Sequence, residues 1–204
     1  MMKYKCLFLT GDMQTGKSTA ILESIRPYPR NLIGGFMCQR LINNGETKAF
    51  CLTEISSVKS AVIEYKADIP NIFLENKCGK WERNDEVFDV KGAEMLSDIS
   101  SSRLIILDEI GGFELLSEKF MEKIYDVLFG GTPVIGVIKS NKNKSIMEKA
   151  VKTDDKYTEL HRKLFSDIEN NFGGKIVRTQ KDNMVNVQNE IKDFLNKAVR
   201  GALH

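Results

Sequence analysis

Short apolar segments alternate with amphipathic segments along most of the chain. Buried strands are predicted at residues 4–9, 104–107, 133–138 and 175–178. Helices are predicted over residues 17–25, 92–100, 120–128, 156–170 and 187–199, and a capping box at Ser145 and Glu148 predicts a further short helix. Strands that alternate with helices are typical of a mostly parallel sheet flanked by helices, so the pattern predicts the α/β class.

A different pattern occupies residues 35–90. Two strands, over residues 35–42 and 46–55, flank Asn43-Asn44-Gly45, a hairpin turn signal because asparagine and glycine tolerate positive φ angles. We expect this antiparallel hairpin to extend or flank the main sheet. Residues 1–204 are therefore expected to form a single domain, with 35–90 as a β-rich insertion or sheet extension.

The remainder of this insertion has a weaker pattern. Apolar fragments predict short strands at residues 61–65 and 87–90. The polar stretch over residues 75–86 is interpreted as a surface loop.

The composition excludes several classes of protein. The chain has 204 residues, of which 42% are hydrophobic, 28% are charged and only 4 are proline, which excludes collagen-like, disordered and disulfide-scaffold proteins. Its uninterrupted apolar stretches are far shorter than the ~20 residues of a membrane helix. The first residues show neither the long apolar stretch nor the small-residue cleavage site of a signal peptide. We therefore expect a soluble cytoplasmic protein.

Charge and cysteine usage indicate no macromolecular partner. The net charge is +2, and the mildly basic final third carries lysines that alternate with acids, as on a solvated helix face, which argues against a nucleic-acid partner. The 4 cysteines form no CxxC pair and there are only 2 histidines, so reduced, buried cysteines are expected rather than a zinc site. The sequence does not determine the oligomeric state, and a monomer is favoured.

The run from Gly11 to Ser18 fits the phosphate-loop motif G-x-x-x-x-G-K-[ST], between a predicted strand and a predicted helix. Glycines let the loop curl until its backbone N–H groups point at phosphate oxygens, and the helix start adds its positive dipole end. Lys17 is expected to contact the β- and γ-phosphates, Ser18 to bind Mg²⁺ and Thr19 to reach the α-phosphate. The candidate nucleotide-binding residues are Gly11, Asp12, Met13, Gln14, Thr15, Gly16, Lys17, Ser18 and Thr19.

Two carboxylates follow the apolar strand at residues 104–107. At the carboxyl end of a buried parallel strand, where α/β sheets bind ligands, Asp108 is expected to hold Mg²⁺. Glu109 is placed to polarise an attacking water and is therefore a candidate catalytic residue. The alternative for Glu109 is an acid at a helix start or on the surface.

Phosphoryl transfer needs a further cation, because its transition state is stabilised mainly by charge and positioning. Lys139 follows the predicted strand that ends at Ile138, so it should emerge at the same sheet edge as Asp108. We therefore favour Lys139 as a catalytic residue. The alternatives are Arg40, Arg162 or a residue from a partner subunit, and each of these cations in the chain is also interpretable as a solvated surface charge.

The loop after Glu109 contains two adjacent glycines and another carboxylate. Gly111 and Gly112 indicate either backbone that is close to the nucleotide or mobile, or a loop that simply needs positive φ angles. Glu114 is either a carboxylate that supports the metal site from behind or an exposed acid. The sequence leaves both choices open.

The sequence resembles a family of nucleoside-triphosphatases first described from thermophiles, which has a human cancer-related relative. The resemblance covers most of the chain and is carried by residues 11–19, by Ile33-Gly34-Gly35-Phe36, and by residues 107–111 with Glu114, Leu115 and Phe120. It implies a RecA-like P-loop fold with a small β insertion. It also implies Mg²⁺-dependent hydrolysis of ATP, GTP and other nucleoside triphosphates to the diphosphate, with little base selectivity.

The chain departs from the family pattern at three places. Met13 and Gln14 stand where members often have proline and glycine. The charged residues expected near the first hairpin strand are not clearly matched by Cys38-Gln39-Arg40. Asn183 is followed by Met184 where the family tends to have an Asn-Arg pair. If that arginine binds the base or phosphate in relatives, this protein binds it otherwise or more weakly.

Two other functions remain open at this point. A P-loop small-molecule or nucleotide kinase usually carries an arginine-rich lid, whereas residues 139–165 contain many lysines and a single arginine, Arg162. A non-enzymatic nucleotide-dependent switch would bind nucleotide tightly, and a partner would recognise the loop at residues 110–116. The candidate lids over the site are the polar stretch 75–86 and the loop after Lys139.

Overall fold

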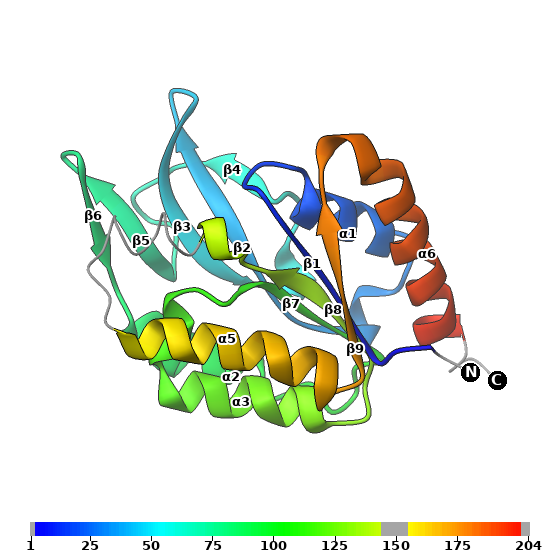
Figure 1. Ribbon diagram of the computed structural model, residues 1–204. Coiled ribbons are helices and arrows are strands. Elements are labelled where there is room, and N and C mark those ends of the chain that lie inside the picture. Colours follow the sequence, from blue (N-terminus) through cyan, green and yellow to red (C-terminus); the bar gives the residue numbers. More distant parts are fainter. Residues whose placement is uncertain (1–2, 144–154, 201–204) are drawn as a thin grey trace.

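The computed structural model describes residues 3–143 and 155–200. Over these residues the strands form one mixed sheet in the order β6-β5-β3-β2-β7-β8-β1-β9, with β4 paired to β2 (Figure 1). The strands are β1 Cys6–Gly11, β2 Ile33–Asn43, β3 Glu46–Glu54, β4 Val62–Glu64, β5 Ile72–Lys77, β6 Lys80–Arg83, β7 Leu104–Ile110, β8 Val134–Ile138 and β9 Gly174–Thr179. The α/β class is confirmed, and so are the predicted strands at both ends of the chain.

The strands that position the site are parallel. β1 pairs with β8 and β9, β8 with β7, and β7 with the first residues of β2, all in the same direction. β1, β7 and β8 are almost wholly buried, which explains why the sequence shows them as uninterrupted apolar segments. Their carboxyl ends meet at one edge of the sheet, so the loops that follow these three strands lie together.

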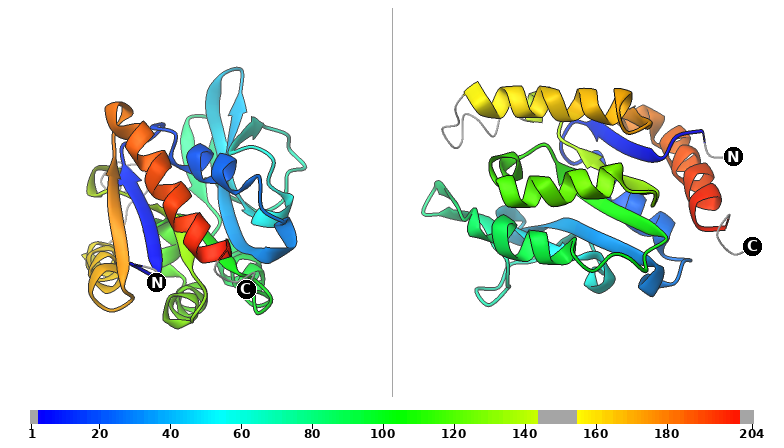
Figure 2. Two further views of the ribbon diagram at one scale, coloured as in Figure 1. Left: turned by 90° about the vertical axis from the view of Figure 1, so that its right-hand side faces the viewer. Right: turned by 90° about the horizontal axis from the view of Figure 1, so that it is seen from below.

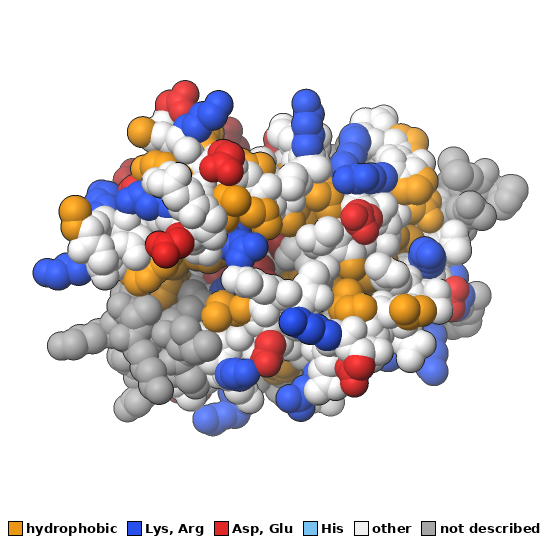
Figure 3. Space-filling view, turned by 90° about the horizontal axis from the view of Figure 1, so that it is seen from above, with side chains coloured by type: hydrophobic (Ala, Val, Ile, Leu, Met, Phe, Trp, Pro, Cys, Tyr) orange, Lys and Arg blue, Asp and Glu red, His pale blue; other side chains and the backbone are white. Residues whose placement is uncertain are grey.

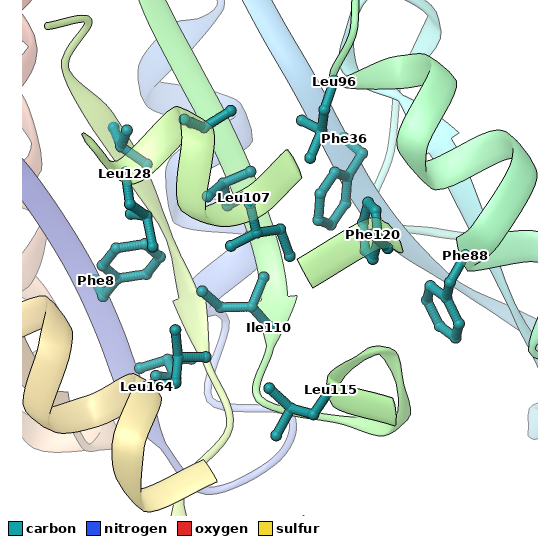
Figure 4. Packing of buried hydrophobic residues seen from close by; sticks show 14 of the residues in the cluster. Phe8, Phe36, Phe88, Leu96, Leu107, Ile110, Leu115, Phe120, Leu128 and Leu164 are labelled. Atoms are coloured by element: carbon teal, nitrogen blue, oxygen red, sulfur yellow. The ribbon is translucent and has the colours of Figure 1, made fainter. Parts of the chain in front are cut away.

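Helices cover both faces of the sheet (Figures 1 and 2). Each layer has its own hydrophobic core, and successive residues of β1 serve different cores: Leu7 packs with Ile21 on one face, and Phe8 with Leu164 on the other (Figure 4). The first face is covered by α1 (Lys17–Ile25) and α6 (Met184–Arg200), and the second by α2 (Ala93–Met95), α3 (Glu118–Phe129) and α5 (Asp155–Asn170). Short 3-10 helices span Arg30–Leu32, Ile55–Ser57, Phe113–Leu116 and Lys181–Asn183.

In the far half of the sheet β2, β3, β5 and β6 pair antiparallel, and β4 is added parallel to β2. β2 continues beyond its parallel pairing with β7 and turns back into β3 through Asn44 and Gly45, both at positive φ, so the predicted hairpin is confirmed as an extension of the sheet. The surface loop predicted for residues 75–86 is wrong, because β5 and β6 form a second hairpin there, turning at Cys78 and Gly79. The end of β5 that lies within 75–86 is polar, and β6 alternates exposed and half-buried residues, so this stretch has too few apolar residues for the sequence pattern to show a strand.

The strand predicted at residues 87–90 is also wrong. Residues Phe88–Gly92 form a π-helical turn that continues into α2, so the predicted helix at 92–100 begins earlier and ends at Met95. Val87 and Phe88 pack into the core while Val90 is exposed, a spacing that fits a helix rather than a strand. The short strand predicted at 61–65 is confirmed as β4. The capping box at Ser145 and Glu148 lies outside the described residues.

The surface mixes both charges. Figure 3 shows Lys and Arg side chains beside Asp and Glu side chains across the face seen from above. Among the helices that the structure describes, none combines the length and the apolar character needed to cross a membrane.

Candidate functional site

The phosphate loop connects β1 to α1. Gly16 caps the helix at φ 88°, and Gln14 adopts φ 60°, so the loop passes twice through the left-handed region. The left-handed conformation costs roughly 1–2 kcal/mol of conformational energy for a residue that has a Cβ. Gln14 adopts this conformation at a position where the family that the chain resembles often has glycine. The loop therefore keeps the curled shape that the motif predicts, in spite of this departure.

The ammonium group of Lys17 lies inside the curl of the loop. Its Nζ donates to the backbone oxygen of Asp12 at 2.6 Å, to that of Gly11 at 3.3 Å and to Oγ1 of Thr15 at 3.2 Å. Burial lowers the pKa of Lys17, and the carboxylates at the end of β7 oppose this shift. The loop therefore presents a nearly buried cation to an anionic ligand.

Asp108 is fully buried at the end of β7 and lies beside Ser18. The Ser18 hydroxyl donates to Oδ1 of Asp108 at 2.8 Å, and the backbone N–H of Cys38 on β2 donates to Oδ2 at 3.3 Å. Burial, together with the charge of Glu109, raises the pKa of Asp108 to about 7, while the bond from Ser18 opposes the rise. A carboxylate that is costly to ionise in isolation is stabilised by a cation, which is the property of a metal ligand.

The chemistry of this pair fits Mg²⁺. This cation prefers oxygen ligands and keeps several waters, so it is commonly bound by one or two carboxylates together with phosphate oxygens. Ser18 and Asp108 offer a hydroxyl and a carboxylate within hydrogen-bond distance of each other, next to the phosphate loop. Within residues 3–143 and 155–200, no group of three or more His, Cys, Asp and Glu side chains converges on one point.

A β-bulge at the end of β7 turns two consecutive carboxylates to the same edge. The register with β8 shifts before Ile110, so Asp108 and Glu109 together face the single residue Val137. Glu109 adopts φ 62° at this point. Successive side chains of a regular strand point to opposite faces, so the bulge is what brings both acids to the phosphate loop.

Lys139, the first residue after β8, forms an ion pair with Glu109. The distance from Nζ of Lys139 to Oε2 of Glu109 is 2.5 Å, and the two side chains are only 15% and 26% exposed. Burial opposes the charge on each group, but the partner's charge outweighs it. The pKa of Glu109 is therefore lowered and that of Lys139 is raised, so both groups are charged at neutral pH.

The left-handed backbone at residue 109 predicts an unusual order of stability. Glu109→Gly is expected to be more stable than Glu109→Ala by about 1 kcal/mol, because glycine adopts this angle without a Cβ clash. Both variants lose the ion pair with Lys139, so the comparison isolates the backbone. Denaturant unfolding of the two variants measures the difference, and an alanine variant of equal or greater stability contradicts it.

Residues after β8 cross over the phosphate loop. Nδ2 of the buried Asn143 donates to the backbone oxygen of Gly11 at 3.0 Å, and Nζ of Lys142 pairs with Oδ2 of Asp12 at 2.8 Å. The Gly11 oxygen also accepts from Lys17. The strand that delivers Lys139 is thereby tied to the loop that delivers Lys17.

Two buried side chains of α5 hold the loops from the other side. Tyr157 donates its hydroxyl proton to the backbone oxygen of Gly111 at 3.2 Å. Nε2 of His161 lies 2.9 Å from the backbone oxygen of Lys139. The segments after β7 and β8 are therefore both anchored to one helix.

The structure brings together the phosphate loop, Asp108, Glu109 and Lys139, as the sequence predicts. Arg162 is exposed on α5, and Arg40 lies in the second half of β2, between Phe50 of β3 and Val62 of β4. Glu114 is 5% exposed, so its interpretation as an exposed acid is wrong.

The sequence does not predict that Cys38, Lys142 and Asn143 contact the site. The only signal for the last two was their position shortly after the strand that ends at Ile138. Cys38 offered none, because its contact with Asp108 depends on the pairing of β2 with β7.

Comparison with known proteins gives one family. A model of the protein family described as NTPase matches residues 6–197. Nucleoside-triphosphatase THEP1 of Methanocaldococcus jannaschii is 26% identical over 171 residues, which are 80% of this chain and 95% of the relative. THEP1 of Methanosarcina acetivorans is 26% identical over 134 residues (64% and 73%), and the cancer-related nucleoside-triphosphatase homolog of Mus musculus is 26% identical over 148 residues (69% and 78%).

Two solved structures have the same fold. The crystal structure of THEP1 from the hyperthermophile Aquifex aeolicus superposes with a TM-score of 0.62 at 16% identity, covering 93% of this chain and 98% of that one. The solution structure of a human cancer-related nucleoside triphosphatase superposes with a TM-score of 0.61 at 19% identity, covering 95% and 98%. At these identities the likeness concerns the fold.

Proposed function

The chain belongs to the NTPase family, and we propose that it catalyses Mg²⁺-dependent hydrolysis of nucleoside triphosphates to the diphosphate and phosphate, with little base selectivity. The observation that carries the proposal is the bulge at the end of β7, which sets Glu109 beside Asp108 at the phosphate loop. A second acid at this position has a task in hydrolysis, where a water must be activated. The relatives named as nucleoside-triphosphatases support the same reaction class.

Binding begins at the phosphate loop. Lys17 exchanges the backbone oxygens of Asp12 and Gly11 for oxygens of the β- and γ-phosphates, which are stronger acceptors because they are charged. Ser18 and Asp108 would hold Mg²⁺, which, when bound, neutralises charge on the same phosphates. Loop amides and the start of α1 complete the contacts with the anion.

Hydrolysis is assigned to Glu109 and Lys139. Glu109 is ionised, because Lys139 lowers its pKa against the effect of burial, and it orients the attacking water and accepts its proton. The water oxygen bonds to the γ-phosphorus as the bond to the β–γ bridging oxygen breaks, and that oxygen leaves with the diphosphate. Lys139 stays protonated and stabilises the charge that develops at this edge of the sheet.

The side chain of Asn183 is used within the turn that follows β9. Asn183 uses its side-chain amide within the turn: Oδ1 accepts from the N–H of Gln180 at 2.8 Å, and Nδ2 donates to the backbone oxygen of Arg178 at 2.9 Å. The amide thus closes a capping box instead of facing a ligand, and Met184, which follows it, offers no charge.

Removal of Mg²⁺ is expected to stop phosphate release. Excess chelator should abolish release from ATP, and added Mg²⁺ should restore it. Ser18→Ala should raise the Mg²⁺ concentration for half-maximal rate by about 10-fold or more, because the variant loses the hydroxyl beside Asp108. Ser24→Ala, at the other end of α1, is the matched control and should behave as the wild type. Release that continues in excess chelator contradicts the proposal.

We also propose that residues 1–204 form a single domain, with residues 35–90 as an extension of its sheet. The proposal is supported by β2, which pairs parallel with β7 in the main sheet and antiparallel with β3 in the extension.

A further inference from the structure

Glu114 is a buried carboxylate that binds backbone rather than solvent. It lies in the 3-10 helix after β7, where Oε1 accepts from the N–H of Gly111 at 2.5 Å and from that of Gly112 at 2.8 Å. Burial raises its pKa, while Lys139 and these two amides oppose the rise. Two charge-assisted bonds at one oxygen are strong, so Glu114 fixes the course of the turn directly after the catalytic acid.

The same turn is anchored at its ends. Ile110 and Leu115, which flank it, both point into the hydrophobic cluster beneath α3 and α5 (Figure 4). The N–H of Lys139 donates to the backbone oxygen of Ile110 at 2.8 Å, so the turn is also joined to the end of β8. Tyr157 holds the backbone oxygen of Gly111, and Glu114 holds the N–H groups of Gly111 and Gly112.

Both catalytic side chains depend on this short stretch. Glu109 stands immediately before it in a left-handed conformation that a regular strand does not impose. A Cβ added to Gly112 would lie 2.7 Å from Cε of Lys139 and 2.8 Å from Oε2 of Glu114, so the Lys139 side chain packs directly against this backbone. A shift of the turn therefore displaces Glu109, because the two are continuous in the backbone. It also displaces Lys139, because the Lys139 side chain packs against the turn.

We propose that Glu114 is a positioning residue, which holds the backbone of Gly111 and Gly112 so that Glu109 and Lys139 stay in place for the water and the γ-phosphate. This inference rests on the proposed hydrolysis. Glu114 contacts the backbone of Gly111 and Gly112 and not the phosphate loop. We therefore expect its loss to lower the rate of the chemical step rather than to weaken nucleotide binding. A misplacement of reacting groups by 1 Å costs about 10²-fold in rate, which sets the expected effect.

The test compares four variants by phosphate release, by titration with a non-hydrolysable ATP analogue and by thermal unfolding. Glu114→Ala is expected to lower kcat about 10²-fold while the Kd of the analogue changes less than about threefold, at a temperature where the variant is folded. Glu114→Gln keeps the acceptor oxygen and should recover most of the lost rate. Gly112→Ala displaces Lys139 and should lower kcat in the same way, whereas Gly131→Ala, with open space around it, should not.

A purely structural role gives a different result. In that case Glu114→Ala lowers Tm but leaves kcat at the wild-type value below Tm, which overturns the proposal, as does an equal loss of kcat in Glu114→Gln. Amide hydrogen exchange at Gly111 and Gly112 gives a readout independent of catalysis. Exchange should be faster in Glu114→Ala than in the wild type, and unchanged exchange overturns the inference. A wild type that releases no phosphate overturns the proposed function instead.

Discussion

Lys17→Ala is expected to reduce the rate of phosphate release at saturating nucleotide by at least about 10²–10³-fold, and to weaken nucleotide binding as well. The ammonium group is the cation that the phosphate loop encloses, and its partners there are backbone and hydroxyl oxygens that phosphates can replace. Its loss removes a charge that contacts the nucleotide in both ground state and transition state, so kcat and KM both suffer. Steady-state release from ATP with Mg²⁺ measures the effect.

The matched control for this prediction is Lys91→Ala. Lys91 is an exposed lysine paired with Glu94 on the far side of the sheet from α1, so its removal deletes the same charge outside the site. Circular dichroism establishes that both variants are folded. If Lys17→Ala releases phosphate as fast as Lys91→Ala, the phosphate loop does not bind the substrate in the way described.

Glu109→Gln should separate binding from chemistry. The amide cannot accept the proton of the attacking water, so kcat is expected to fall by at least about 10²-fold. Binding of a non-hydrolysable triphosphate should be retained or tightened, because Lys139 no longer has to leave a carboxylate 2.5 Å away in order to reach the γ-phosphate. The rate is read from phosphate release and the affinity from titration with the analogue.

Glu118→Gln is the control for this second prediction, because Glu118 is an almost fully exposed glutamate at the start of α3. An unchanged kcat in Glu109→Gln would remove Glu109 from the mechanism. If Glu109→Gln instead binds the analogue more weakly and keeps the wild-type kcat, the Glu109 carboxylate maintains the nucleotide-binding site and takes no part in the chemical step.

The parts of the site that follow from local sequence could be predicted. The phosphate loop is a contiguous motif, and Asp108 and Lys139 each follow an apolar run that reads as a buried parallel strand. Parallel strands place their carboxyl ends at one edge, so the proximity of these residues follows from the strand pattern alone. Their assigned roles stay predictions, and so does the favoured monomer.

What the sequence could not predict depends on register and tertiary contact. The bulge that turns Glu109 towards Asp108 is a shift in pairing between β7 and β8, and the residues themselves carry no signal for it. Glu114 can be buried because the N–H groups of Gly111 and Gly112 donate to its carboxylate. These N–H groups reach the carboxylate only when the turn is folded, so the sequence alone does not show the burial.

The errors in the fold have a similar origin. The β5–β6 hairpin pairs with β3, and its apolar residues Phe73 and Trp81 pack against Phe50 of that strand. Within residues 75–86 Trp81 is almost the only large apolar residue, so the sequence pattern there is typical of a loop. Residues Phe88–Gly92 form a π-helical turn, and its side-chain period matches neither the two-residue period of a strand nor the 3.6-residue period of an α-helix. In both cases the neighbouring elements determine the structure.

The most direct test of the account is phosphate release from ATP, GTP, CTP and UTP with Mg²⁺ and no acceptor, by the wild type and by Glu109→Gln in parallel. The account predicts release from all four nucleotides at comparable rates by the wild type, and negligible release by Glu109→Gln, which still binds nucleotide. Tight binding with no release by the wild type would contradict it, and would indicate a kinase without its acceptor or a switch without its partner.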